Sequence, residues 1–183
     1  MAAVSIKARA LRYLAMREHS RAELARKLAR PPQGRQGATR TGRDDGVASD
    51  AHPAQPDDPA ASRAAIARVL DELASRGLLD EQRAADAVVA AQSRRFGQRR
   101  LQQSLRQRGL GADEAAAALA RIEGSEFERA HAIWQRRFGS PAADAAERAR
   151  QARFLAGRGF AGDVIRRVVQ GLGDDGNEGS DED

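Results

Sequence analysis

Residues 94–109 read Arg-Arg-Phe-Gly-Gln-Arg-Arg-Leu-Gln-Gln-Ser-Leu-Arg-Gln-Arg-Gly, and this pattern decides the fold class. Leu101 and Leu105 are four residues apart and therefore share one face of a helix. At about 100° per residue, Arg99, Gln103 and Arg106 lie together on the opposite face. The segment thus predicts a short helix with a small apolar face and a basic, amide-bearing back. An ordinary solvated helix surface would give the same pattern.

The rest of the chain has the same helical character. Alanine, arginine, leucine and glutamate favour helices, and no run of β-branched or aromatic residues alternates with a period of two. The pairs Ser20/Glu23 and Ser125/Glu128 have the spacing of capping boxes, in which a serine caps a helix start and a glutamate bonds back. We therefore predict an all-α fold with about nine helices.

Short strings recur along the chain and indicate repeated helical units. Arg-Arg-Phe-Gly occurs at 94–97 and again at 136–139, and an Arg-Gly-apolar turn occurs at 76–78, 108–110 and 158–160. Such recurrence is typical of stacked helical repeats. We expect tandem three-helix repeats in an elongated, curved arrangement, with the first at 1–76, the second at 77–123 and the third at 124–171.

Two segments have the composition of disordered chain. Residues 31–59 contain five prolines and four glycines with a single valine, so this insertion in the first repeat cannot bury enough apolar surface to fold. Residues 172–183 carry six acids and no base and form a predicted disordered acidic tail. The sequence leaves the role of both segments open.

Composition excludes several classes of function. The chain has no cysteine and no apolar run of membrane-spanning length, which indicates a cytoplasmic protein. His19 and His131 lack a third ligand pattern, and the glycine-rich string 157–162 follows a predicted helix rather than a strand. We expect no catalytic residue, no cofactor and no metal. The net charge is +5 although the tail holds six acids, and this basic body favours a polyanion or an acidic protein surface as partner.

Arginines are the candidate binding residues, because the planar guanidinium can donate two hydrogen bonds at once to a phosphate or a carboxylate. Some of them could instead bond carbonyls at helix ends. The Trp134/Phe138 pair is better explained as a core stripe than as a stacking site. The candidate partner- or DNA-binding residues are Arg94, Arg95, Arg99, Arg100, Arg106, Arg108, Arg148, Arg150, Arg153, Arg166 and Arg167.

Three strings together resemble the RecX family, which regulates the RecA recombinase: Leu-Asp-Glu-Leu with Gly-Leu-Leu-Asp at 70–80, Phe-Gly-Gln-Arg-Arg-Leu at 96–101, and Arg-Phe-Leu-Ala-Gly-Arg-Gly-Phe at 153–160. The resemblance implies an elongated monomer that lies in the groove of the RecA–DNA filament. It also implies inhibition of the ATPase, strand-exchange and co-protease activities, and a place in DNA repair, recombination and the SOS response. The insertion, and Ala84 and Val88 where the family often has aromatics, depart from the pattern.

The residues alone are also compatible with two other functions. An independent nucleic-acid-binding helical module would bind bare DNA without a recombinase. A helical scaffold would bind some other acidic partner. The strength and the sign of regulation, and the division of the arginines between recombinase and DNA, are not decided by the sequence.

Overall fold

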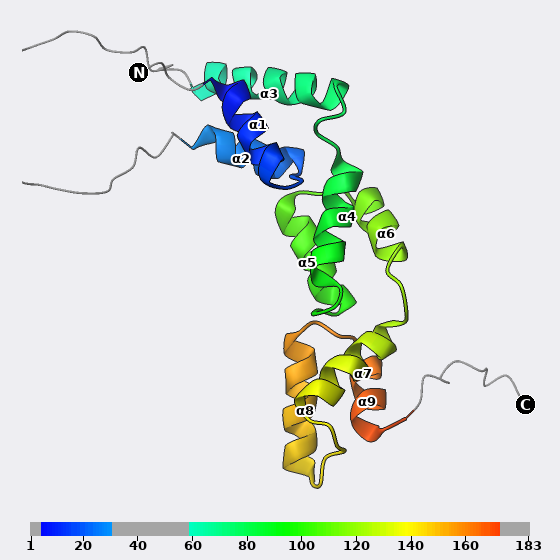
Figure 1. Cartoon of the computed structure of the whole chain (residues 1–183). Helices are drawn as coiled ribbons and strands as arrows, with labels where there is room; N and C mark the ends of the chain where they lie inside the picture. The colour runs from blue at the N-terminus through cyan, green and yellow to red at the C-terminus, as the bar shows by residue number, and fades with distance from the viewer. Residues whose placement is uncertain (1–4, 31–58, 173–183) are drawn as a thin grey trace, which may run out of the picture. The chain divides into compact units, whose positions relative to one another are not determined.

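The computed structural model describes residues 5–30 and 59–172, and within these ranges the chain forms nine α-helices and no strand (Figure 1). This confirms the all-α prediction. The predicted acidic tail beyond Leu172 and residues 31–58 of the predicted insertion lie outside the described residues. The helices are α1 (Ile6–Met16), α2 (Arg21–Ala29), α3 (Pro59–Ser75), α4 (Glu81–Gln92), α5 (Gln98–Arg108), α6 (Ala112–Ala120), α7 (Glu126–Arg137), α8 (Ala145–Gly157) and α9 (Gly162–Gln170).

The chain divides into two compact units, Met1–Asp80 and Glu81–Asp183. In the first unit, α1, α2 and α3 enclose a core of buried leucines with Ala10 and Ile66. Helix α3 begins at Pro59, which is the last residue of the segment assigned to the insertion by its composition. The Lys7 ammonium lies 2.7 Å from the Glu72 carboxylate and joins α1 to α3 at the surface.

The second unit contains two separate cores, each built by three consecutive helices. Helices α4, α5 and α6 enclose one around Val88, Leu105 and Ala118. Helices α7, α8 and α9 enclose the other around Trp134 and Phe160. Together with the core of the first unit, this gives three cores for three predicted repeats. The division at 76/77 and 123/124 stays a proposal, and Leu79, which follows the first boundary, packs in the core of the first unit.

Local sequence explains where these helices begin and end. The Ser20 hydroxyl accepts a hydrogen bond from the Glu23 backbone N–H at 3.1 Å, and Ser125 forms the full reciprocal capping box with Glu128. Gly109 ends α5 at φ +77°, a left-handed conformation that glycine adopts without a Cβ clash. Leu110 then folds back, and its N–H donates to the Leu105 carbonyl at 3.2 Å.

Helix α5 has the two faces that its spacing predicted. Leu101 and Leu105 are fully buried, whereas Arg99, Gln103 and Arg106 are exposed. The core assignment of Trp134 is also confirmed. Its ring is buried, and its indole N–H donates to the Gln151 side-chain oxygen at 2.8 Å. In the part of the chain that the structure describes, no helix has the length and apolarity to cross a bilayer.

Candidate functional site

Two glycines allow the loop before α5 to touch the turn between α8 and α9. The Gly97 N–H donates to the Arg158 carbonyl at 3.0 Å, and the Arg99 N–H donates to the Gly159 carbonyl at 3.2 Å. A Cβ at Gly97 would lie only 2.4 Å from the Gly159 oxygen. Between these two residues, the N–H of Gln98 donates to the Glu126 carboxylate at 2.7 Å. The third predicted repeat thus supplies the N-terminal cap of a helix in the second, and we call this contact the junction.

The junction brings both copies of the Arg-Arg-Phe-Gly string to one small pocket. The pocket has a volume of about 220 Å³, and we call it the arginine pocket. Its walls are five arginines, its remaining lining is apolar, and no acidic residue contributes. The lining residues are Arg94, Arg95, Arg136, Arg137, Arg158, Ile133 and Phe154.

A second hollow continues from Arg95 along α5. It has a volume of about 420 Å³ and is lined by polar amides and two arginines, again without an acid. The Phe96 ring lies beneath both guanidiniums, with ring-centre distances of 5.5 Å to Arg95 and 4.7 Å to Arg100. We call this hollow the glutamine pocket, after Gln92, Gln103 and Gln107, which line it with Arg95, Phe96, Arg100 and Ser104.

Three guanidiniums of the arginine pocket, those of Arg95, Arg137 and Arg158, lie over aromatic rings rather than against carboxylates. Arg158 stacks on Phe154 at 4.6 Å, and its Nη1 donates to the Arg95 carbonyl at 3.2 Å. Its Nε is covered and has no acceptor among the described residues. None of the five arginines forms an ion pair within the described ranges. Their charge is therefore available to an anion, for which stacked guanidiniums present a planar fork of donors.

The arginines predicted in 94–108 fall in different places. Arg94 and Arg95 line the arginine pocket, and Arg100 lines the glutamine pocket. Arg99 and Arg106 are exposed on α5 outside both pockets, and Arg108 is half-buried in its last turn. Only part of the basic segment is thus brought together by the fold.

The arginines predicted in 148–167 lie on α8 and α9, and none of them lines either pocket. Arg150 lies 2.9 Å from the Glu147 carboxylate, and Arg167 stacks on Phe127 at 4.8 Å. Arg148, Arg153 and Arg166 are exposed. A binding role for any of the eleven candidates stays a prediction.

Three pocket arginines were not among the candidates: Arg136, Arg137 and Arg158. The signal for the first two was present, because the second Arg-Arg-Phe-Gly copy repeats the basic pair of the first. Arg158 begins the third Arg-Gly-apolar string, and it bonds the Arg95 carbonyl across the junction.

The described residues contain no group of three or more histidine, cysteine or acidic side chains that could hold a metal ion. His19 is buried in the turn between α1 and α2, and His131 is exposed on α7 between the Phe127 and Trp134 rings. The string 157–162 joins the end of α8 to the start of α9, as its helical context predicted.

Comparison with known proteins gives a consistent result at the level of sequence. Residues 125–169 match the family model described as RecX, third three-helix domain. The "Regulatory protein RecX" of Leptothrix cholodnii is 46% identical over 91% of this chain and 88% of its own length. The protein of the same name from Ralstonia nicotianae is 41% identical over 96% of this chain and 94% of its own.

Solved structures agree on the fold. A crystal structure of RecX from Lactobacillus salivarius matches with a TM-score of 0.61 and covers 91% of this chain and 94% of its own, at 17% identity. A second, titled "Crystal structure of regulatory protein RecX", matches with a TM-score of 0.62 over 90% of this chain and 71% of its own. Since the sequence relatives extend over nearly the whole chain and the helical fold is the same, the chain belongs to the RecX family of regulatory proteins.

Proposed function

We propose that this chain regulates the RecA recombinase by binding in the groove of the RecA–DNA filament. In this proposal it mainly inhibits the ATPase, strand-exchange and co-protease activities. The observation that carries the proposal is the arginine pocket, in which five guanidiniums meet without an acid. A filament groove is lined by phosphates and carboxylates, and both are ligands for such a pocket.

The proposed mechanism needs no chemistry from the chain itself. The helical units bridge neighbouring recombinase subunits through their arginines and oppose the conformational step that ATP turnover requires. Such a protein can inhibit only by as much as its affinity for one filament conformation exceeds its affinity for the other. The chain acts in this proposal as a non-enzymatic monomer in the cytoplasm.

An ATPase titration tests the proposal. The purified chain, added to recombinase on single-stranded DNA, should slow ATP hydrolysis in proportion to its occupancy of the filament. A version ending at residue 171, without the tail that starts at Leu172, reports whether the tail's acids oppose binding. An unchanged hydrolysis rate at several-fold excess of well-folded protein would refute the proposal.

The same pocket also favours a second function, that of an independent nucleic-acid-binding module. If five arginines each met a phosphate of single-stranded DNA, affinity would fall on the order of 100-fold between 50 and 200 mM salt. Filter binding on bare DNA across a salt series, with recombinase absent, separates the two functions. Tight and steeply salt-dependent binding, without any effect on the ATPase, would favour the module.

A further inference from the structure

A larger hollow of different chemistry lies in the second unit and shares Arg94 with the arginine pocket. It has a volume of about 810 Å³ and is formed by α4, the end of α6, the loop that follows and the start of α7. Its lining includes aliphatic residues of α4 and the α6–α7 loop, such as Val89, Ala90 and Ile122. Two carboxylates, Asp86 and Glu123, line it as well, and we call it the mixed pocket.

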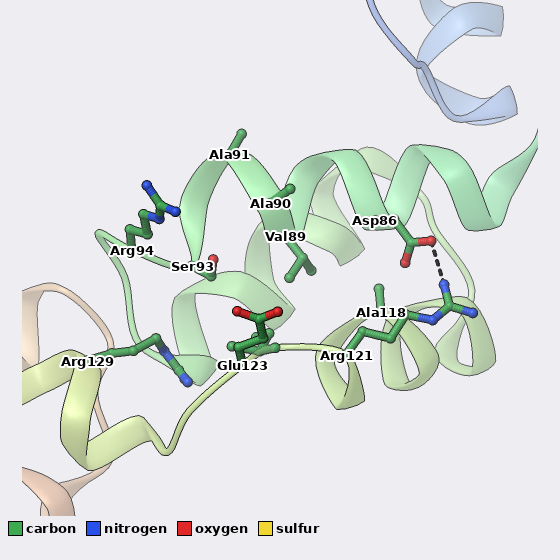
Figure 2. Close-up of a pocket in the computed structure, with 11 residues that line it drawn as sticks. Asp86, Val89, Ala90, Ala91, Ser93, Arg94, Ala118, Arg121, Glu123 and Arg129 are labelled. Atoms are coloured by element: carbon green, nitrogen blue, oxygen red, sulfur yellow. Dashed lines mark hydrogen bonds and ion pairs between the residues drawn. The ribbon is translucent and has the colours of Figure 1, made fainter.

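The charges of the mixed pocket differ in how far they are already paired. Asp86 forms an ion pair with Arg121 and also accepts a hydrogen bond from the Gln82 side-chain amide at 3.0 Å. Figure 2 shows this pair on one side of the pocket, with Arg94 and Arg129 on the other and the Glu123 carboxylate between them. Within the described ranges, Arg94, Glu123 and Arg129 form no ion pair.

Arg129 is the group that most needs a partner. It is half-buried, its Nη1 donates to the Gly124 carbonyl at 3.0 Å, and its Nε is covered and finds no acceptor in the described part of the chain. Burial lowers the pKa of this guanidinium, and the nearby Glu126 and Glu128 offset that only in part. A partly desolvated cation without an ion pair gains more from an incoming carboxylate than a fully hydrated one does.

The chemistry of the lining favours a protein over a nucleic acid as occupant. Asp86 is paired with Arg121, but Glu123 would repel the successive phosphates of a nucleic acid, whereas a protein segment can place a single acid beside Arg129 and a hydrogen-bond donor beside Glu123. The aliphatic floor offers contact to an apolar side chain. Next to that apolar side chain, Arg129 and Arg94 can pair with one acidic side chain of the bound segment. Glu123 can accept a hydrogen bond from a donor group of the same segment.

We propose that the mixed pocket is the protein-contact site of this chain, taking a recombinase segment in which an acidic residue stands next to a large aliphatic one. This inference rests on the proposed function. The mixed pocket then contacts recombinase while the arginine pocket meets phosphates, and Arg94, which lines both pockets, lies at the boundary between the two surfaces.

Two substitutions in the full-length chain test the inference. Ala90→Glu places a bulky carboxylate at an exposed position of the floor, where it fills the space and repels the incoming acid. Arg129→Gln removes the charge but keeps an amide that can still bond the Gly124 carbonyl. The matched control is Ala87→Glu, the same change at an exposed α4 position that does not line the pocket.

Binding is measured to immobilised recombinase freed of nucleic acid, and separately to a fluorescent single-stranded oligonucleotide. We expect each test variant to lose at least about fivefold in recombinase affinity, the loss typical of an interface anchor. Oligonucleotide affinity should stay within about twofold of wild type, and the control should bind both ligands normally.

The outcomes of these binding measurements distinguish a failure of the inference from a failure of the proposed function. Wild-type recombinase affinity in both test variants would overturn the inference while leaving the proposed function intact. An equal loss of oligonucleotide affinity would also overturn it, since the hollow would then belong to the nucleic-acid surface. No recombinase binding by the wild-type chain, with or without DNA, would overturn the proposed function and the inference together.

Discussion

Replacing Gly97 by alanine should weaken the third predicted repeat, although Gly97 belongs to the second predicted repeat. The backbone of Gly97 is extended, with φ −77° and ψ 170°, so alanine is not strained there. The cost arises from the new Cβ, which would lie 2.4 Å from the Gly159 oxygen and from the Phe160 nitrogen. Both are backbone atoms and cannot rotate away. The junction must therefore open by roughly 1 Å to restore an ordinary contact distance.

Opening the junction breaks the hydrogen bonds from Gly97 to Arg158 and from Arg99 to Gly159. Each contributes about 0.5–1.5 kcal/mol net, so the expected loss is about 2 kcal/mol. With a urea dependence of about 1–2 kcal/mol per molar for a unit of this size, the unfolding midpoint should fall by about 1–2 M. Repeat proteins transmit such losses, because interfaces between neighbours contribute directly to stability.

The chain provides its own reporter for this effect. Trp134 is the only tryptophan, and it is buried in the core of α7, α8 and α9. Its fluorescence during urea unfolding follows the third repeat alone. Gly157→Ala is the matched control, since a Cβ at Gly157 would meet nothing within 4 Å and alanine favours the helix. An unchanged Trp134 midpoint in Gly97→Ala would refute the coupling of the two repeats through the junction.

Three further predictions concern a pair of arginines and two single side chains. Neutralising Arg136 and Arg137 together by glutamine should lower DNA affinity at least about tenfold and reduce the slope of log affinity against log salt by about 1.4, measured by anisotropy. Gln151→Met leaves the buried Trp134 N–H without its acceptor and should cost about 1–3 kcal/mol in urea unfolding. Burial opposes ionisation of Glu23, but the hydrogen-bonded Arg17 guanidinium and the adjacent His19 outweigh it and hold its pKa at about 2. Glu23 therefore contributes at most about 3 kcal/mol to the free energy of unfolding, complete above pH 4.5 and lost as the pH falls toward 2. In Glu23→Gln, stability measured by circular dichroism should fall less steeply between pH 4.5 and pH 2 than in wild type.

The helices were predictable because their determinants are local. Leu101 and Leu105 define a buried face through their spacing alone, and Ser20 and Ser125 cap helices through neighbours three residues away. The left-handed turn glycines act over a similarly short range. No distant contact is needed for any of these features, so the sequence pattern contains the whole signal.

The site was predictable only in part, because its geometry depends on a contact between residues about sixty positions apart. Arg94 and Arg95 could be selected from their charge, but their meeting with Arg158 follows from the close approach of Gly97 to Gly159. Charge alone likewise favoured the arginines of α8 and α9, which the fold places outside both pockets.

The junction also explains how an acid can lie near the arginine pocket without neutralising it. Glu126 is the acidic residue that the third repeat brings to the start of α5. Its carboxylate accepts the Gln98 N–H at 2.7 Å, at the helix end where the backbone dipoles favour negative charge. Occupied there, it forms no ion pair with any pocket arginine in the described part of the chain. The same contact that assembles the five guanidiniums therefore holds the adjacent carboxylate on a backbone cap, and the pocket keeps its positive charge for an external anion.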